Sequence, residues 1–110
     1  MMASSPEFVN YIVDQLQGSG QIRQIKMMGE HCIYCDDVVV GLVICDVFFL
    51  KNTSSNHELL SDCELAEPYP GAKPAYLIKD VDDREFMKRI VRNVCDDLIK
   101  NKKKKRIPSK

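Results

Sequence analysis

The chain has 110 residues, of which 45% are hydrophobic and 29% are charged, and its formal net charge is zero. This length and composition favour one domain with a core of its own. Because no apolar run approaches about 18 residues, a membrane-spanning helix is excluded. The charge is unevenly placed: residues 100–110 hold seven of the 16 Lys and Arg and no Asp or Glu, so residues 1–99 carry a net charge of −7. We do not expect so acidic a body to attract nucleic acid.

The N-terminus reads MMASSPEF and has neither the basic start nor the apolar stretch of a signal peptide, which favours the cytoplasm. The cysteines are odd in number and lie mostly within apolar runs. This pattern favours reduced, buried thiols over a disulfide framework. The five are Cys32, Cys35, Cys45, Cys63 and Cys95.

A first helix is predicted after Ser4 or Ser5, either of which can cap its N-terminus, with Pro6 in the first turn. An apolar stripe at helical spacing runs from Phe8 to Leu16. Two glycines then end the helix, because glycine accepts the left-handed backbone common at helix ends.

Four short strands should follow in a meander. Asp36-Asp37 and Cys45-Asp46 are predicted as two-residue turns, which force neighbouring strands to be antiparallel. Gly41 indicates a bulge or a close approach of another chain segment. The predicted strands cover residues 22–28, 31–35, 38–44 and 47–51.

The second half of the chain should add a short helix over about 54–62, with Leu59 and Leu60 facing inward, and a loop or edge strand near 66–69. A strand at 75–79 and a final amphipathic helix from Asp82 or Asp83 to about Leu98 complete the fold. The fold class is therefore α+β, in the order α-β4-α-β-α. We predict a two-layer sandwich, with an antiparallel meander sheet and helices packed on one face, over residues 1–99.

Residues 23–51 also carry short motifs in a fixed order: Arg-x-x-Lys-Met, Ile-Tyr-Cys-Asp, Gly-Leu and Phe-Leu-Lys. Together they resemble the N-terminal domain of the TfoX/Sxy family, which is named for competence regulators, and the likeness extends over roughly residues 4–98. The matched positions are Arg23, Lys26, Met27, Gly29, Ile33, Tyr34, Cys35, Asp36, Gly41, Leu42, Phe49, Leu50 and Lys51.

The resemblance implies a helix-flanked sheet similar to secretion-chaperone-like folds. It also implies a role linked to competence or transcription regulation, without a defined biochemical activity. The chain departs from the family pattern at Met28, where Phe is usual, and at Glu30 and Asp37, where Gly is usual.

Cys32 and Cys35 form a C-x-x-C motif, but residues three apart on a strand point to opposite faces. We therefore expect inert sheet cysteines, since only His31, His57 and Cys63 are available as further ligands for a metal. Neither histidine has a nucleophile or an orienting carboxylate at a recognisable spacing, so we expect both to be solvated or capping. The prediction is a non-enzymatic protein without a cofactor or metal.

One sheet face should remain outside the helix layer, because Phe48 and Phe49 must point to opposite sides. Such a face favours an unknown protein partner or a homodimer. The candidate surface residues, at matched or nearly matched family positions, are Lys26, Met28, Gly29, Tyr34 and Lys51.

Residues 100–110 are predicted to form a basic flexible tail. An alternative function is nucleic-acid binding by this tail, because several cations together displace counterions from phosphates. It lacks interleaved aromatic residues that would stack on bases. The cations concerned are Lys102, Lys103, Lys104, Lys105 and Arg106.

Overall fold

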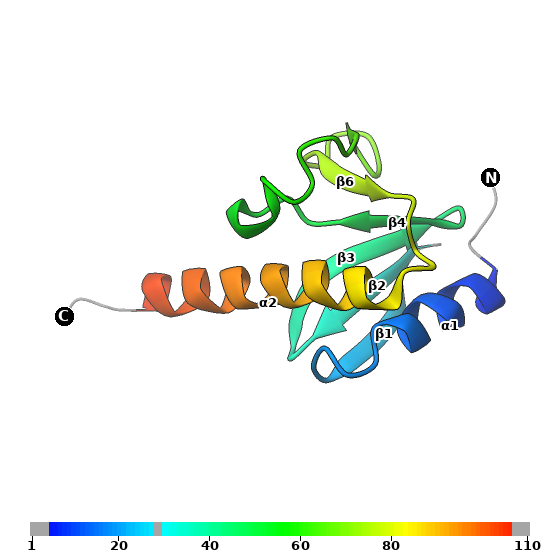
Figure 1. Cartoon of the computed structure of the whole chain (residues 1–110), viewed down its shortest axis with the longest axis horizontal. Helices are drawn as coiled ribbons and strands as arrows, with labels where there is room; N and C mark the ends of the chain where they lie inside the picture. The colour runs from blue at the N-terminus through cyan, green and yellow to red at the C-terminus, as the bar shows by residue number, and fades with distance from the viewer. Residues whose placement is uncertain (1–4, 28–29, 107–110) are drawn as a thin grey trace.

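A computed structural model describes residues 5–27 and 30–106; for residues 102–106 it gives the course of the helix only. Six strands form one antiparallel sheet in the order β1-β2-β3-β4-β6-β5, and both helices lie on the same side of it (Figure 1). The predicted two-layer α+β sandwich is confirmed. The elements are α1 (Pro6–Gln15), β1 (Ile22–Met27), β2 (Glu30–Cys35), β3 (Val38–Ile44), β4 (Val47–Leu50), β5 (Leu65–Ala66), β6 (Ala75–Ile78) and α2 (Arg84–Arg106).

Helix α1 begins where its capping residues predict. The Ser5 side chain accepts a hydrogen bond from the Phe8 amide at 3.2 Å, and Pro6 occupies the first turn. Val9 and Ile12 point from this helix into the core. The strand order then brings α1 beside α2 over the sheet (Figure 1).

The tight turns of the meander are confirmed at both predicted positions. Asp36 and Asp37 have φ angles of 50° and 71°, and Cys45 and Asp46 have φ angles of 51° and 60°. Two consecutive residues with positive φ match the right-handed twist of the strands that they join. Gly41 makes the predicted close approach, since a Cβ there would lie 2.4 Å from a backbone oxygen of the next strand.

The core lies between the sheet and the helices. Phe48 is fully buried beneath the helices, whereas Phe49, which is 9% exposed, points to the other face of the sheet. The predicted division of these two rings is confirmed. The other large, fully buried side chains are Ile12, Leu16, Ile33, Leu50, Met87, Ile90, Val9, Val40, Val43, Val91 and Val94.

The helix predicted over residues 54–62 is wrong. Only a 3₁₀ turn over Ser54–Asn56 forms, followed by turns. The buried Asn56 amide donates to the Ile90 carbonyl of α2 at 2.9 Å, and its oxygen accepts from the Asn93 side chain at 2.8 Å. These tertiary bonds fix the segment in place of a regular helix. Leu60 is buried as expected, but Leu59 is 42% exposed.

Two further boundaries differ from the prediction. The edge strand β5 covers Leu65–Ala66, one residue before the predicted position, and the prolines of the following loop cannot extend it because they lack an N–H. Helix α2 continues six residues past Lys100, through the lysine-rich segment to Arg106 (Figure 1). The division into a folded unit at 1–99 and a flexible tail stays a prediction. No helix in the described part is both long and apolar enough to cross a membrane.

Candidate functional site

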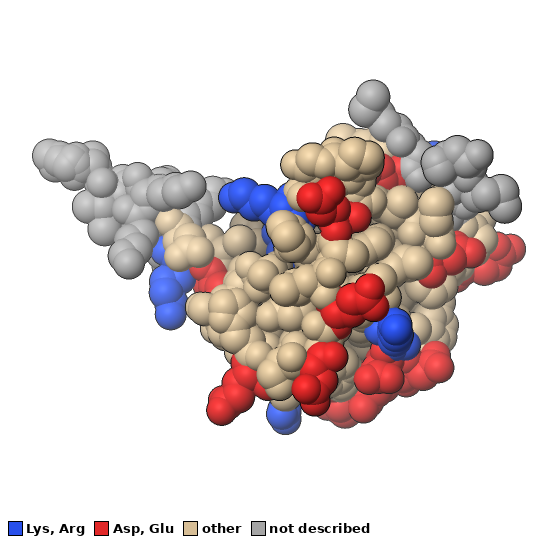
Figure 2. Space-filling view, turned by 90° about the horizontal axis from the view of Figure 1, so that it is seen from above, with Lys and Arg blue, Asp and Glu red and all other residues tan. Residues whose placement is uncertain are grey.

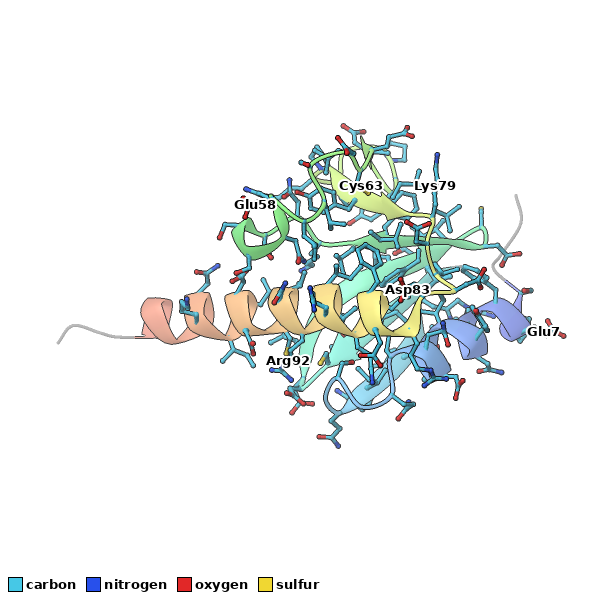
Figure 3. The ribbon with its side chains drawn as sticks, viewed as in Figure 1. Glu7, Glu58, Cys63, Lys79, Asp83 and Arg92 are labelled. Carbon is cyan, nitrogen blue, oxygen red and sulfur yellow. The ribbon has the colours of Figure 1, made fainter. Side chains whose placement is uncertain are left out.

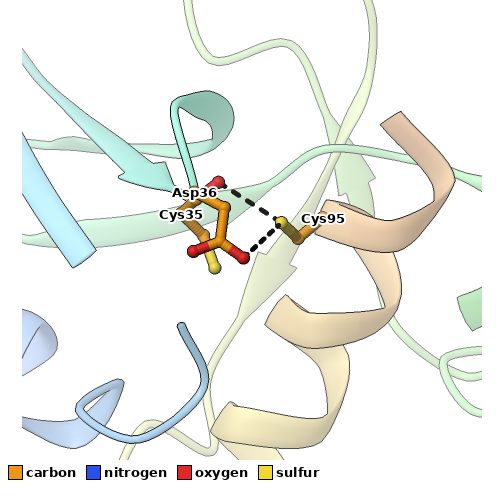
Figure 4. Close-up of side chains that lie close together, drawn as sticks. All are labelled: Cys35, Asp36 and Cys95. Atoms are coloured by element: carbon orange, nitrogen blue, oxygen red, sulfur yellow. Dashed lines mark hydrogen bonds between the residues drawn. The ribbon is translucent and has the colours of Figure 1, made fainter. Parts of the chain in front are cut away.

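Polar and sulfur-containing side chains gather where the β2–β3 turn meets α2. Cys35 ends β2, Asp36 begins the turn and Cys95 lies on α2, and their ligand atoms all lie within 4.8 Å of one another (Figure 4). Arg92 reaches the same place from α2 (Figure 3). We call Cys35, Asp36, Arg92 and Cys95 the turn cluster.

Hydrogen bonds within the turn cluster connect the helix to the hairpin. Arg92 donates to Asp36 Oδ2 at 2.9 Å and to Cys95 Sγ at 3.4 Å. The Cys95 thiol donates to the Cys35 carbonyl at 3.3 Å (Figure 4). Each group of the cluster therefore has a partner on a different element.

The loop between α1 and β1 joins the same network. The Ser19 carbonyl accepts from Arg92 Nη1 at 2.8 Å and from the Cys35 thiol at 3.6 Å. Gly20 packs so closely that a Cβ there would lie 2.6 Å from Cys35 Sγ, and its φ of +150° also favours glycine. The turn cluster thus ties together the α1–β1 loop, the hairpin and α2.

The electrostatics of the turn cluster favour neutral Cys35 and Cys95 thiols beside the ion pair of Arg92 and Asp36. Burial and the neighbouring Cys95 thiol raise the pKa of Cys35 to about 12, and burial raises the pKa of Cys95. The backbone amide of Gln21 and the guanidinium of Arg92 hold the pKa of Asp36 below its usual value.

This arrangement limits the chemistry of the turn cluster. Protonated thiols are poor nucleophiles and poor metal ligands. The Arg92 guanidinium already provides the positive charge beside Asp36 Oδ2 that a metal ion would supply. The turn cluster therefore acts as a structural tie between elements.

The second face of the sheet carries an apolar surface. Strand alternation and pairing place the same-face residues of five strands together, and no helix of the described residues covers them. Ile25 and Met27 are 38% and 47% exposed there. We call this surface the open face; its apolar members are Ile25, Met27, Cys32, Tyr34, Val39, Leu42, Ile44, Val47, Phe49, Ala75 and Leu77.

A groove of about 520 Å³ lies on the open face. It is lined by residues of β3, β4 and the start of β6, by the loop over residues 68–74 and, where α2 extends past the sheet, by Leu98 and Asn101. Lys51 and Lys73 line this open-face groove, and none of its lining residues is acidic. Its apolar lining residues include Val39, Leu42, Phe49, Pro68, Tyr69 and Leu98.

Comparison with known proteins identifies a family for the chain. The TfoX N-terminal domain family matches residues 14–97, which include both the turn cluster and most of the open-face groove. The chain belongs to the TfoX N-terminal domain family. It is also 34% identical over 80 residues to an uncharacterized 12.7 kDa protein in the trpE 5′ region of Spirochaeta aurantia, covering 73% of this chain and 70% of that protein.

Three of the five family-matched surface candidates on this TfoX N-terminal domain lie within the described residues, and they are divided between the two faces of the sheet. Lys51 lines the open-face groove. Tyr34 lies on the same face, with the Arg23 guanidinium 5.0 Å from its ring centroid. Lys26 is exposed on the opposite side of β1, opposite His31 in the register, so it is separated from the other two. Met28 and Gly29 lie outside the described residues, as do the side chains of residues 102–106.

The remaining sequence candidates contact amides. His57 Nε2 lies 3.0 Å from Asn52 Oδ1, and His31 Nδ1 lies 2.9 Å from Gln24 Oε1. His31 is only 9% exposed, so the expectation of a solvated or capping side chain is wrong at that position; β1 and β3 flank it in the sheet. Cys32 and Cys35 point to opposite faces, as the motif spacing predicts.

Sequence reasoning missed Arg92 and Cys95 as members of the turn cluster. Cys95 is 60 residues from Cys35, so no local spacing connects them. The one available signal is on α2 itself, where Arg92 has Asp96 four residues later and Cys95 three residues later. It indicates an arginine at the edge of a buried stripe.

Proposed function

We propose that this TfoX N-terminal domain is a non-enzymatic regulatory module that binds another protein through its open face. A role in competence or transcription regulation, in the cytoplasm, is part of the proposal, because the family is named for competence regulators. The observation that carries it is the open-face groove, with its apolar floor of Val39, Leu42 and Phe49. An apolar groove of this kind is typical of interaction sites on folded domains.

The states of the thiol, carboxylate and imidazole side chains, which are the usual catalytic groups, support a non-enzymatic role. The turn-cluster thiols have raised pKa values, and Asp36 is engaged by Arg92. The two histidines contact amide oxygens, and within the described part of the chain neither is bonded to a carboxylate that would orient it as a base or to a hydroxyl that it could activate.

Site-specific photo-crosslinking in cells tests the proposal. Tyr69, which is 47% exposed, lies on the open-face groove, and Tyr11, which is 39% exposed, lies on α1. Each is replaced in turn by a benzophenone-bearing phenylalanine, and the crosslinked proteins are identified by mass spectrometry. We expect a defined protein from position 69 that is absent from position 11. The proposal fails if both positions give the same set or if position 69 gives none.

A second copy of the chain is one candidate for this partner, because two apolar open faces can pack against each other in a symmetric dimer. Light scattering over a range of concentrations measures the mass. A dimer that dissociates when Leu42 is changed to Lys supports self-association, whereas a monomer at high concentration rejects it.

Nucleic-acid binding by the lysine-rich segment is the second candidate function. The observation that favours it is the continuation of α2 to Arg106, which carries this segment on a helix extending past the sheet (Figure 1). Changing Lys102, Lys103, Lys104 and Lys105 to Gln together should remove a steep salt dependence of duplex DNA affinity. DNA binding that is unchanged by these substitutions, or absent in the full chain, contradicts this candidate.

A further inference from the structure

The cations of the open-face groove differ from three cations on α2. Arg84 and Arg92 are paired with Asp14 and Asp36 at 3.0 and 2.9 Å, and Lys88 is paired with a glutamate on its own helix. Among the described residues, Lys51 and Lys73 have no ion-pair partner.

These unpaired lysines lie in an acidic protein. Residues 1–99 carry 16 acidic and nine basic groups, and on the face shown in Figure 2 acidic side chains outnumber basic ones. The absence of acidic residues from the groove lining, which contains two lysines, therefore makes the groove a local positive site. Charges around a low-dielectric groove act on a ligand more strongly than charges on a flat, solvated surface.

The groove also has apolar lining residues. Leu42 and Phe49 form a cross-strand pair of β3 and β4 on the open face, and Tyr69 of the loop is 47% exposed beside them. A ligand that fills the groove must therefore place apolar groups on the floor and anionic groups at its margins. A volume of about 520 Å³ lies within the range of sites that enclose a ligand segment.

We infer that the open-face groove binds an acidic peptide segment with interspersed apolar residues, whose carboxylates contact Lys51 and Lys73 and whose apolar side chains pack on Leu42 and Phe49. The inference rests on the proposed function and names the chemistry of the partner. Opposite charges at the margin of such a site guide association and orient the segment, and the apolar floor contributes most of the affinity.

A peptide fits these observations better than a nucleic acid does. Nucleic-acid affinity requires many phosphate contacts from a continuous basic surface, and the groove offers two lysines on an acidic body.

Selection from a random-sequence peptide library displayed on phage tests the inference. The full chain is compared with a double variant, Lys51→Glu with Lys73→Glu. The matched control is Lys79→Glu, at an exposed lysine just after β6 that points away from the body (Figure 3). We expect the wild type and Lys79→Glu to enrich peptides that combine Asp or Glu with Leu, Ile or Phe.

Anisotropy titration of the selected peptides gives the quantitative readout. We expect the double variant to bind them about tenfold or more weakly than wild type, and Lys79→Glu to bind them within about twofold. Circular dichroism checks that the variants are folded; both groove lysines are exposed, so the fold should be retained.

Three results overturn the inference. They are selected peptides without acidic residues, no selected binder at all, and a duplex DNA affinity that exceeds the peptide affinity and falls in the Lys51→Glu, Lys73→Glu variant. The proposed function is judged separately: a protein crosslinked from position 69 through a neutral or basic segment leaves that function standing while the inference fails.

Discussion

The turn cluster and the open-face groove use similar side chains for different ends. Both combine cations with apolar neighbours, and they lie on opposite faces of one sheet. In the turn cluster, Arg92 reaches a carboxylate, a carbonyl and a thiol, so every group is satisfied within the chain. In the groove, Lys51 and Lys73 have no ion-pair partner among the described residues, beside an apolar floor. Polar groups that are bonded to each other, as in the turn cluster, stabilise the fold. Charged groups without an ion-pair partner, as in the groove, are available to a ligand.

The largest effect is expected from Gly20→Ala. A Cβ at this position would lie 2.6 Å from Cys35 Sγ and 3.0 Å from Arg92 Nη1, so the turn cluster would have to move. We expect a loss of about 3 kcal/mol in the free energy of unfolding, measured by urea titration. Gly18→Ala is the matched control: its φ of +99° is also positive, but its Cβ would meet only Lys88, at 3.6 Å. It should cost about 1 kcal/mol. Equal losses of unfolding free energy in the two variants would show that backbone strain, and not the contact with the turn cluster, causes the effect of Gly20→Ala.

Arg92→Ala should come next. The substitution leaves the Asp36 carboxylate and the Ser19 carbonyl without their cationic donor. Arg92 is about one-third exposed, and water will replace part of what is lost, so we expect a loss of about 2 kcal/mol. Arg89→Ala, at an exposed position three residues earlier on α2, should change stability by less than about 0.5 kcal/mol. A similarly small change for Arg92→Ala would mean that the turn cluster does not stabilise the fold.

Thiol reactivity gives an independent measure of how closed the turn cluster is. Cys35 and Cys95 are both 0% exposed, and their pKa values are raised. Alkylation by iodoacetamide should therefore label them at least about tenfold more slowly than the exposed Cys45, as followed by peptide mapping in a mass spectrometer. Labelling in urea should remove the difference. Comparable native rates would mean that the cluster opens readily.

Acid should weaken the turn cluster. The Gln21 amide and Arg92 lower the pKa of Asp36 in the folded state, so its contribution to stability is present above the unfolded pKa of about 3.9 and is lost as the pH falls through the folded value. Asp36→Asn should therefore show a shallower loss of stability on acidification than the wild type, measured by thermal melting. Asp62→Asn, at an exposed carboxylate away from the cluster, should follow the wild-type curve.

The sequence predicted the parts of the fold that depend on local patterns. Positive-φ turns at Asp36-Asp37 and alternation at Phe48 and Phe49 follow from neighbouring residues alone. The conformation of residues 54–62 could not be predicted in this way. The hydrogen bonds between Asn56 and α2 override the helical pattern of that segment. Propensity is a weak guide where tertiary hydrogen bonds compete with it.

The candidate sites were harder to predict for the same reason. The sequence indicates Lys51 only as a matched family position, and Lys73 and Leu98 come beside it only through the fold. The turn cluster joins Cys35 to Cys95 across 60 residues. Such groups become neighbours when α2 packs on the sheet, and no spacing in one sequence records that contact.

The smallest effect should come from the groove lysines themselves. Changing Lys51 and Lys73 to Gln should alter the free energy of unfolding by less than about 0.5 kcal/mol, because these exposed side chains have no ion-pair partner among the described residues. Urea titration of the double variant beside Arg92→Ala makes the comparison direct. A loss as large as that of Arg92→Ala would mean that the lysines stabilise the fold. A negligible loss, together with weaker binding of acidic peptides, would separate stability on the helix-covered face from recognition on the open face.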